Sequence, residues 1–471
     1  MSTPESTAAP PSTRDETDSM GVIQVPSDAL WGAQTQRSLQ FFAIGQQRMP
    51  IEVIHALAHI KHAAAEVNQA LGLLEPAVAD AIAGAASRVA QGEFDVHFPL
   101  SVWQTGSGTQ THMNVNEVIA NLASVALGGE LGTQRLVHAH DQVNLGQSSN
   151  DVFPTAIHLA VLGQTWSLQA SMTHLRQALQ AKATTLAGVP KVGRTHLQDA
   201  TAITFGQEFG AYDAQLAHAE QGLHNALPAV HALAIGGTAV GTGQNTHPAF
   251  GERVAARLSE RLSVPQGKTL KVAHNRFAAL SGQEPLVLLH AALRSLAIAL
   301  MKIGNDVRLM ASGPHGGLGE IRLPANEPGS SIMPGKVNPT QVEALTMVCV
   351  QVMGHDVSIG MAASQGQFEL NVYQPLIVHN TLDSLRLLTD AMDSFRRHCI
   401  EGIQVNAAHA ALVLSQSLMM ATALTPHIGY DRAARIVAHA QSSGMTLRDA
   451  ALAVGGVSPD EFDAWIAHGP N

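Results

Sequence analysis

Aromatic side chains are scarce in this sequence. Only 4% of its 471 residues are Phe, Trp or Tyr, although 45% are hydrophobic. A β-rich fold draws on aromatic and β-branched side chains, so this composition favours helices packed closely through small residues such as Ala and Leu. The chain is long enough for two or three ordinary domains and a large core. We therefore expect an all-α fold.

Cysteine is also rare. Cys349 and Cys399 lie far apart, each within an apolar helical pattern. This usage predicts buried thiols in a reducing compartment. Two cysteines cannot bind a four-iron cluster in the usual way, with cysteine as every protein ligand, which argues against iron–sulfur chemistry.

The sequence has no basic block. Lys and Arg number 27 against 37 Asp and Glu, which gives a formal charge of −10. This balance argues against nucleic acid and against an anionic membrane as partners. An anionic substrate would therefore need local positive potential, from cationic side chains in a cleft or from helix N-termini.

No recognisable targeting signal begins the sequence. Residues 1–13 are rich in Ser, Thr, Pro and Ala, and the acidic residues that follow do not suit an organellar transit peptide. We expect a disordered tail over residues 1–17 and a cytoplasmic protein.

Apolar residues recur at helical spacing over most of the chain. After an extended lead-in at residues 21–36, the pattern predicts two antiparallel helices within 51–92. Longer helices are expected at the following ranges: 111–127, 154–186, 203–233, 286–310 and 340–361. The run 286–310 is apolar nearly all round and is expected to be buried on every side, in a long bundle with room for other subunits at its centre. The expected domains are 18–147, 148–407 and a small helical domain at 408–471.

Residues 329–339, Gly-Ser-Ser-Ile-Met-Pro-Gly-Lys-Val-Asn-Pro, form the most distinctive segment. Glycine and proline exclude both helix and strand here, so we expect a polar loop held between helices. Composition alone fits a surface turn as well as a catalytic loop. A phosphate-binding loop is excluded, because five residues separate the two glycines and Val337 follows Lys336.

Four other polar segments interrupt the helical pattern. Gly106 to Thr109 and Gln147 to Asp151 each precede a helix, where capping alone would explain the hydroxyl and amide side chains. Gly193 to Ala200 contains a single histidine, which most often has a structural role. Arg135 to Asp141 contains a histidine pair that suggests a metal. With 24 histidines such pairs arise by accident, and no His-Glu-x-x-His motif supports zinc.

The 329–339 segment resembles, residue for residue, the signature loop of the fumarase/aspartase superfamily of lyases. The other polar segments resemble the remaining blocks of the same family, and together they are most similar to its class II fumarases. The resemblance extends from about Asp18 to the C-terminus. It implies an all-α, three-domain fold with a central bundle of twenty helices from four subunits. Each active site would then draw on three chains.

The resemblance also implies roles for individual residues. Ser330 would remove the substrate proton, His196 would serve the departing or attacking water, and Glu343 would orient His196. Dicarboxylate contacts would come from Ser107, Gly108, Thr109, Ser148, Ser149, Asn150, Thr195, Ser331, Lys336, Val337 and Asn338. A secondary anion site would comprise Arg135, His138, Ala139, His140 and Asp141.

The implied reaction is the reversible hydration of fumarate to (S)-malate in the tricarboxylic acid cycle. Water would add in the anti sense through an aci-carboxylate intermediate, without metal or cofactor. The serine alkoxide and the dianionic intermediate would both need stabilisation by helix N-termini, main-chain N–H groups and Lys336.

Two alternatives remain open at this stage. A related lyase that releases ammonia or a larger amine would share the fold and Ser330 but should lack His196. A binding or structural protein could retain the fold without catalysis, although the residues assigned to catalysis are intact. The sequence departs from the family pattern at His112, His140, Leu145, His315, Gly316 and Gln374.

Overall fold

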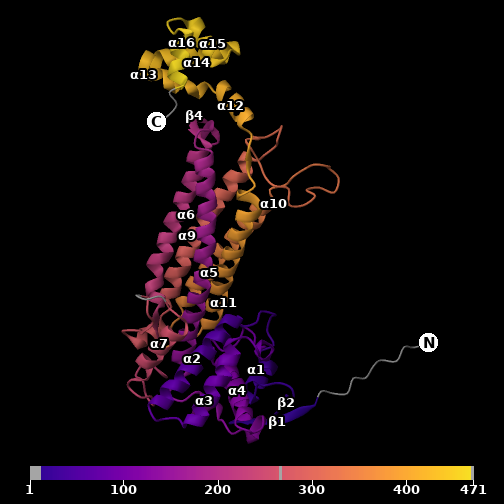
Figure 1. Cartoon of the computed structure of the whole chain (residues 1–471), viewed down its shortest axis with the longest axis vertical. Helices are drawn as coiled ribbons and strands as arrows, with labels where there is room; N and C mark the ends of the chain where they lie inside the picture. The colour runs from indigo at the N-terminus through magenta and orange to yellow at the C-terminus, as the bar shows by residue number, and fades with distance from the viewer. Residues whose placement is uncertain (1–11, 265–267, 468–471) are drawn as a thin grey trace, which may run out of the picture. The chain divides into compact units, whose positions relative to one another are not determined.

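Helices dominate the computed structural model, which describes residues 12–264 and 268–467. Figure 1 shows long helices through much of the chain and only short strands. Within the described ranges the strands form four two-stranded sheets. The expected all-α class is confirmed.

The chain divides into two compact units, and five long helices contribute residues to both. Unit 1 comprises residues 1–168, 222–294 and 351–386, and unit 2 comprises 169–221, 295–350 and 387–471. The long helices are α5 (Ser149–Thr185), α6 (Phe205–Val230), α9 (Glu284–Met310), α10 (Thr340–Ala363) and α11 (Gln374–Phe395). The units divide inside these helices, so the expected domain borders after residues 147 and 407 stay a prediction.

Unit 1 contains the N-terminal part of the chain and the segments around α7. Its strands are β1 (Thr13–Asp18), β2 (Gly21–Pro26), β5 (Ala232–Leu233) and β6 (Lys271–Val272). Its complete helices are α1 (Ala33–Phe41), α2 (Ile51–Ala70), α3 (Pro76–Ala90), η1 (Asp95–His97), α4 (Thr109–Ala126), η2 (Gly132–Gln134), η3 (Ala139–Val143), α7 (Phe250–Arg261) and α8 (Arg276–Ser281). The helix pair expected within 51–92 corresponds to α2 and α3.

The expected disordered tail is wrong at its C-terminal end. Strand β1 pairs antiparallel with β2, Thr13 opposite Pro26 and Asp18 opposite Gly21. Acidic residues that resembled a solvated tail have partners, since the fully buried Glu16 forms ion pairs with Arg14 and Arg135. Residues 1–11 of the expected tail lie outside the described residues.

Unit 2 contains the loop 329–339 and the C-terminal helices. Its strands are β3 (Pro190–Thr195), β4 (Gln198–Thr204), β7 (Ile321–Arg322) and β8 (Gln404–Val405). Its complete helices are η4 (Arg396–Ile400), α12 (Ala407–Gln416), η5 (Leu418–Leu424), α13 (Thr425–Ile428), α14 (Tyr430–Ser443), α15 (Leu447–Val454) and α16 (Pro459–Ala467). The last five of these helices share a small core built on residues such as Leu424, Ile436 and Leu447.

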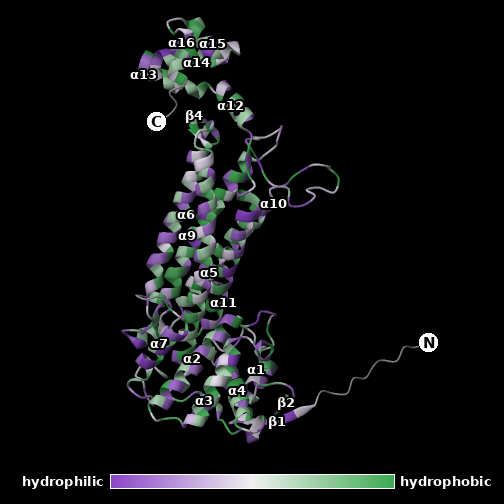
Figure 2. Ribbon diagram, in the orientation of Figure 1, coloured by the Kyte–Doolittle hydropathy of each residue, from purple (hydrophilic) through white to green (hydrophobic). Residues whose placement is uncertain are grey.

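Side-chain contacts within unit 2 hold the long helices together as a bundle. Arg176 of α5 forms ion pairs with Asp213 and Glu220 of α6. The Tyr212 hydroxyl of α6 donates a hydrogen bond to Asp306 of α9. Hydrophobic residues recur along these helices, as Figure 2 shows. The bundle expected from the helical spacing is present within this unit.

Helix α9 is not buried on every side in the single chain. Its Leu286, Leu293 and Leu300 are buried, but Leu288 and Ile298 are 57% and 55% exposed. Helix α10 likewise exposes apolar side chains at residues 347, 350, 357 and 361, whose spacing places them on one face. Helical spacing reports which positions are apolar but not whether one chain alone covers them.

Length and composition alone would allow two helices of the described ranges, α9 and α10, to cross a membrane. The bent pair Ala407–Gln416 and Leu418–Ile428 would add a third if it counted as one span. Only 44% and 28% of the most apolar windows of α9 and α10 are buried. Both helices therefore present apolar surface that the chain itself does not cover.

Both cysteines are buried, as expected. Cys349 lies on α10 and Cys399 on η4. Burial raises the pKa of each thiol to about 12, so both stay protonated at neutral pH.

The segment around His196 forms a hairpin that the sequence pattern did not predict. Strands β3 and β4 pair antiparallel, with Thr195 opposite Gln198. The two turn residues, His196 and Leu197, have φ of 56° and 59°. Two-residue hairpin turns need this left-handed conformation, which usually falls to Asn or Gly, so both residues are strained.

We expect Leu197→Gly to stabilise the chain by about 1 kcal/mol, because glycine adopts positive φ without steric cost. Leu127 offers a matched control, since it is also exposed but has φ of −89°. Leu127→Gly should lower stability. Urea midpoints of the two variants and the parent would measure both effects, and a lower midpoint for Leu197→Gly would contradict the strain.

Candidate functional site

Two helix N-termini in unit 1 contain the first group of expected site residues. Helix α4 begins at Thr109 after Gly108, which has φ of 72° and no side chain to cap the helix. Gln104 Oε1 accepts a hydrogen bond from the Thr111 N–H at 3.0 Å, in the first turn of α4. The Ser107 and Thr109 hydroxyls lie 2.8 Å apart. Main-chain N–H groups and two hydroxyls at a helix N-terminus are suited to a carboxylate.

The N-terminus of α5 lies beside that of α4. The Ser149 Oγ atom is 2.7 Å from His112 Nδ1, in the first turn of α4. Ser148 Oγ accepts a hydrogen bond from the Asn150 N–H, and the Asn150 side chain donates to the Ala239 carbonyl at 2.8 Å. Unit 1 therefore brings the residues expected near 107–109 together with those at 148–150.

Close backbone contacts explain the glycine before α4. A Cβ atom on Gly106 would lie 1.4 Å from the Val372 carbonyl oxygen. The Gly106 carbonyl also accepts a hydrogen bond from the Gln374 N–H, at the start of α11. The α4 N-terminus is thus set by a main-chain contact that only glycine permits.

In unit 2, residues 329–339 form a loop without helix or strand, as expected. Ser330 Oγ accepts hydrogen bonds from the main-chain N–H groups of Met333, at 3.0 Å, and Ile332, at 3.3 Å. The Asn338 side chain donates to the Gly329 carbonyl and closes the loop. Hydrogen bonds donated to an oxygen stabilise its anionic form, so this geometry favours deprotonation of Ser330.

The residues around Ser330 face solvent. Ser331, Lys336 and Val337 are exposed, whereas Asn338 is half-buried. The backbone at Gly329 lies close to the Lys336 carbonyl oxygen, so a Cβ atom on residue 329 would be only 1.9 Å from it. The two ends of the loop are therefore in contact. The cation and the hydroxyls are therefore available to an anionic ligand.

His196 and Thr195 lie at the exposed end of the β3–β4 hairpin. The buried Glu320 anchors this hairpin through ion pairs with Lys191, at 3.1 Å, and Arg194, at 2.8 Å. Glu320 directly precedes β7, on the segment that leads to the loop 329–339. The hairpin and the start of that segment are thereby linked within unit 2.

The three expected catalytic side chains do not contact one another in the single chain. Glu343 is exposed in the first turn of α10. Among the described residues, no hydrogen bond or ion pair joins the side chains of Ser330, His196 and Glu343.

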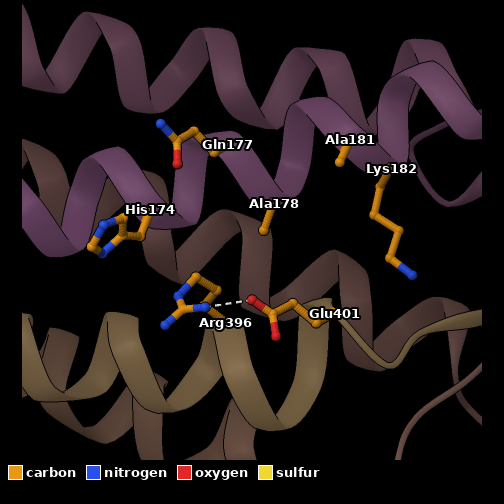
Figure 3. Close-up of a pocket in the computed structure, with 7 residues that line it drawn as sticks. All are labelled: His174, Gln177, Ala178, Ala181, Lys182, Arg396 and Glu401. Carbon is orange, nitrogen blue, oxygen red and sulfur yellow. Dashed lines mark hydrogen bonds and ion pairs between the residues drawn. The ribbon is translucent and has the colours of Figure 1, made fainter.

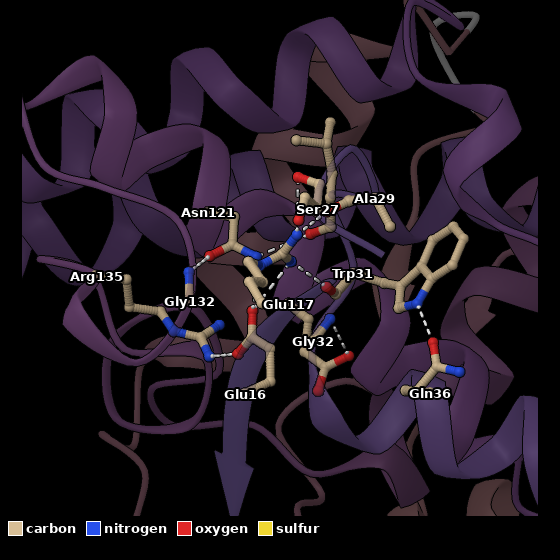
Figure 4. A network of polar contacts seen from close by, with 12 residues as sticks. Glu16, Ser27, Ala29, Trp31, Gly32, Gln36, Glu117, Asn121, Gly132 and Arg135 are labelled. Carbon is tan, nitrogen blue, oxygen red and sulfur yellow. Dashed lines mark hydrogen bonds and ion pairs between the residues drawn. The ribbon is translucent and has the colours of Figure 1, made fainter. Parts of the chain in front are cut away.

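The expected secondary anion site is divided between an ion pair and a surface turn. Arg135 Nη2 lies 2.5 Å from the buried carboxylate of Glu16 (Figure 4). His138 caps η3, which begins at Ala139, and pairs with Asp141 at 3.0 Å. Glu16 thus neutralises the residue that would contribute most charge, and the site stays a prediction.

Sequence reasoning missed Glu117, which stabilises unit 1. Its buried carboxylate accepts hydrogen bonds from the N–H groups of Gly32, Gln34 and Thr35 and from the Thr35 hydroxyl. It therefore caps α1 from another helix. Burial raises its pKa, and the four donors oppose that shift. A carboxylate within the otherwise uncharged α4 pattern was the available signal.

A cavity of about 480 Å³ in unit 2 is separate from all of these residues. Figure 3 shows that α5 side chains, including His174 and Lys182, line it opposite Arg396 and Glu401. Arg396 and Glu401 form an ion pair with each other. Lys182 donates to the Ile403 carbonyl at 2.8 Å. Arg396 Nε is buried without a hydrogen-bond partner among the described residues. The remaining contacts of Arg396 and Lys182 are made within the chain.

Known proteins match this chain over nearly its whole length. Residues 21–354 match a family described as lyase, and residues 420–468 match the fumarase C C-terminus. A protein of Chromobacterium violaceum named fumarate hydratase class II is 59% identical over 96% of this chain and 98% of its own length. The chain belongs to the class II fumarases.

Further comparisons agree with this class II fumarase assignment. A Pseudomonas aeruginosa protein named fumarate hydratase class II 1 is 55% identical over 96% of this chain and 97% of its own length. The crystal structure of a class II fumarase from Schistosoma mansoni superposes with a TM-score of 0.93 at 44% identity, covering 97% of this chain and 98% of that chain.

We expect Gly106→Ala to reduce the kcat/KM of this class II fumarase by more than about tenfold, because a displaced α4 N-terminus would misplace Ser107 and Thr109. Gly84 is the control, since it lies within α3 and a Cβ there would meet nothing within 4 Å. Gly84→Ala should leave kcat/KM unchanged and add about 0.5–1 kcal/mol of stability. An unchanged kcat/KM in Gly106→Ala would show that the contact between Gly106 and Val372 does not position the α4 N-terminus.

Proposed function

We propose that this class II fumarase adds water to fumarate to give (S)-malate and catalyses the reverse elimination. The names of relatives 53–59% identical over almost the full chain support this reaction. The observation that carries the mechanism is the pair of main-chain N–H groups directed at Ser330 Oγ.

Ser330 acts as the base in this proposal. Removing a proton next to a carboxylate places the new charge on carboxylate oxygens, and an ordinary serine is too weak a base for that step. The two N–H groups at Ser330 lower the cost of forming its alkoxide, because hydrogen bonds donated to an oxygen stabilise its anionic form. Preorganised donors at the carboxylate oxygens of the intermediate, where charge develops, would each lower the barrier by about 3 kcal/mol. Lys336 and the α4 and α5 N-termini would hold the dicarboxylate and its aci-carboxylate intermediate.

In this proposal His196 takes a proton from the attacking water, or donates one to the departing hydroxide in the reverse reaction. Imidazole is well suited to accept and donate protons near neutral pH. The hairpin presents His196 to solvent, and its strained turn is the kind of backbone conformation often found at functional sites. Glu343 would orient the imidazole once the two are brought together.

We further propose a homotetramer in which three subunits complete each site. Two features of the described chain support assembly. Within the described residues no hydrogen bond or ion pair joins the side chains of Ser330, His196 and Glu343, and α10 presents an apolar stripe. We define this stripe as Met347, Val350, Val357 and Met361, each between 61% and 67% exposed. Uncovered apolar surface of this kind marks an association site.

The proposal places the protein in the cytoplasm and in the tricarboxylic acid cycle. It assigns no metal and no cofactor to the reaction. It keeps the exposed His138 and Asp141 as part of a secondary anion site. His140 Nε2 there lies 2.8 Å from Gln34 Nε2.

The formation and loss of fumarate, followed by ultraviolet absorbance, would test the reaction. We expect malate to be converted to fumarate in the presence of a chelator, and aspartate not to be converted. Ser330→Ala should lower kcat by at least about 100-fold because the base is lost. Ser442→Ala, at an exposed serine on α14, should keep full activity. Turnover of aspartate would favour an ammonia lyase, and full activity in Ser330→Ala would reject the assigned base.

Charges on the α10 stripe would test the assembly. Val350→Glu with Val357→Glu should shift the molar mass measured by light scattering from tetramer to smaller species, because charged groups in an apolar interface lose hydration. Activity should fall in parallel. Val96, which is 81% exposed on η1, is the control, and Val96→Glu should remain tetrameric. A fully active monomer would contradict the shared site.

A further inference from the structure

A fully buried lysine lies behind the two helix N-termini of unit 1. Lys61 is on α2, and its side chain has no solvent exposure. Its Nζ atom is 2.6 Å from His112 Nε2, 2.9 Å from Asn144 Oδ1 and 2.9 Å from Gln147 Oε1. An ammonium group has three protons, and three acceptors surround it.

Neighbouring main-chain carbonyls fix the orientation of both amides. The Asn144 side-chain nitrogen donates to the Gln147 carbonyl at 3.2 Å. The Gln147 side-chain nitrogen donates to the Val143 and Leu145 carbonyls, each at 3.2 Å. Both amide oxygens must therefore face Lys61, so two of its protons are committed. In the charged form of Lys61, which Asp151 favours, the third proton is directed at His112 Nε2.

This arrangement determines which ring nitrogen of His112 carries the proton. Burial and the Lys61 charge lower the pKa of His112 well below its usual value, so the ring is neutral. Because Nε2 accepts from Lys61, the single ring proton is on Nδ1, 2.7 Å from Ser149 Oγ. Ser149 Oγ then accepts from His112, and its own proton is directed elsewhere.

A buried carboxylate balances the lysine charge. Asp151 accepts hydrogen bonds from the N–H groups of Ser148 and Gly236. Burial raises the pKa of Asp151 to about 6. Burial also lowers the pKa of Lys61 well below its usual value, and the negative charge of Asp151 opposes that shift and favours the charged form of the lysine. A charge on His140 also lowers the pKa of His112, but less than the charge on Lys61 does.

We propose that Lys61 and His112 are positioning residues that hold the Ser149 hydroxyl as a hydrogen-bond donor toward a substrate carboxylate. The inference rests on the proposed function, since it assumes that Ser149 contacts the dicarboxylate. His112 is one of the positions at which this sequence departs from the family pattern, so this chain contacts Ser149 through an imidazole whose tautomer a buried cation sets.

A double-mutant cycle on the full-length enzyme tests the proposal. Ser149→Ala and His112→Leu should each raise the KM for malate about tenfold or more, with a smaller change in kcat. In the His112→Leu background, Ser149→Ala should add less than about twofold, because the hydroxyl is no longer held as a donor. His112→Asn should recover most of the loss, since its amide can donate to Ser149.

His290 provides a matched control for the loss of a buried histidine. It is also fully buried and contacts a serine hydroxyl, that of Ser384, at 2.9 Å. His290→Leu should leave the Ser149→Ala factor at its original value of about tenfold. If His290→Leu lowers the thermal midpoint without changing this factor, His290 has a structural role only.

The outcomes separate this inference from the proposed function. If the parent enzyme does not convert malate, the proposed function fails. If it does, but Ser149→Ala costs the same factor with and without His112, the positioning role is overturned. If His112→Leu does not fold, Lys61→Met replaces it in the cycle. An unchanged Ser149→Ala factor in that background would equally reject the proposal.

Discussion

The hydrogen bond between His112 Nδ1 and Ser149 Oγ joins the first turn of α4 to the first residue of α5. It places two helix N-termini side by side in a chain of formal charge −10. Such a protein repels a dicarboxylate at long range, so attraction must come from fixed local dipoles. The glycine contact at Gly106 and the Lys61 network both serve this one constraint. Under the proposed function, unit 1 would hold the substrate carboxylates.

Unit 2 contains the residues proposed to react with the substrate, and it positions them differently. Ser330 and His196 lie on a loop and on a hairpin turn, whose backbones are free of a regular hydrogen-bond pattern. Each is held by a few polar contacts: two N–H groups fix Ser330 Oγ, and Glu320 fixes the hairpin through Lys191. Positioning a few atoms on short segments while rigid helices support them is a common arrangement for catalytic groups.

The sequence allowed some of these features to be predicted and hid others for physical reasons. Glycine and proline identified the loop at 329–339. Small hydroxyl residues marked the segment before α4, which begins at Thr109 although the expected helix began at residue 111. The hairpin was missed because its turn is His196-Leu197 and lacks the Asn or Gly that usually marks one. Glu16 is buried against Arg135, which is distant in sequence, and Leu288 is exposed because no other described part of the chain covers it. Local spacing reports neither fact.

The buried thiols have a consequence for chemical damage. The thiolate is the form of cysteine that peroxides and alkylating reagents attack, and a pKa of about 12 leaves almost none of it at neutral pH. Oxidants would therefore act first on exposed thioethers. Met333, 48% exposed and a donor to Ser330 Oγ through its N–H, is the methionine whose sulfoxide would lie closest to the chemistry. If Ser330 is the base, oxidation of Met333 would lower activity, and reduction of the sulfoxide would restore it.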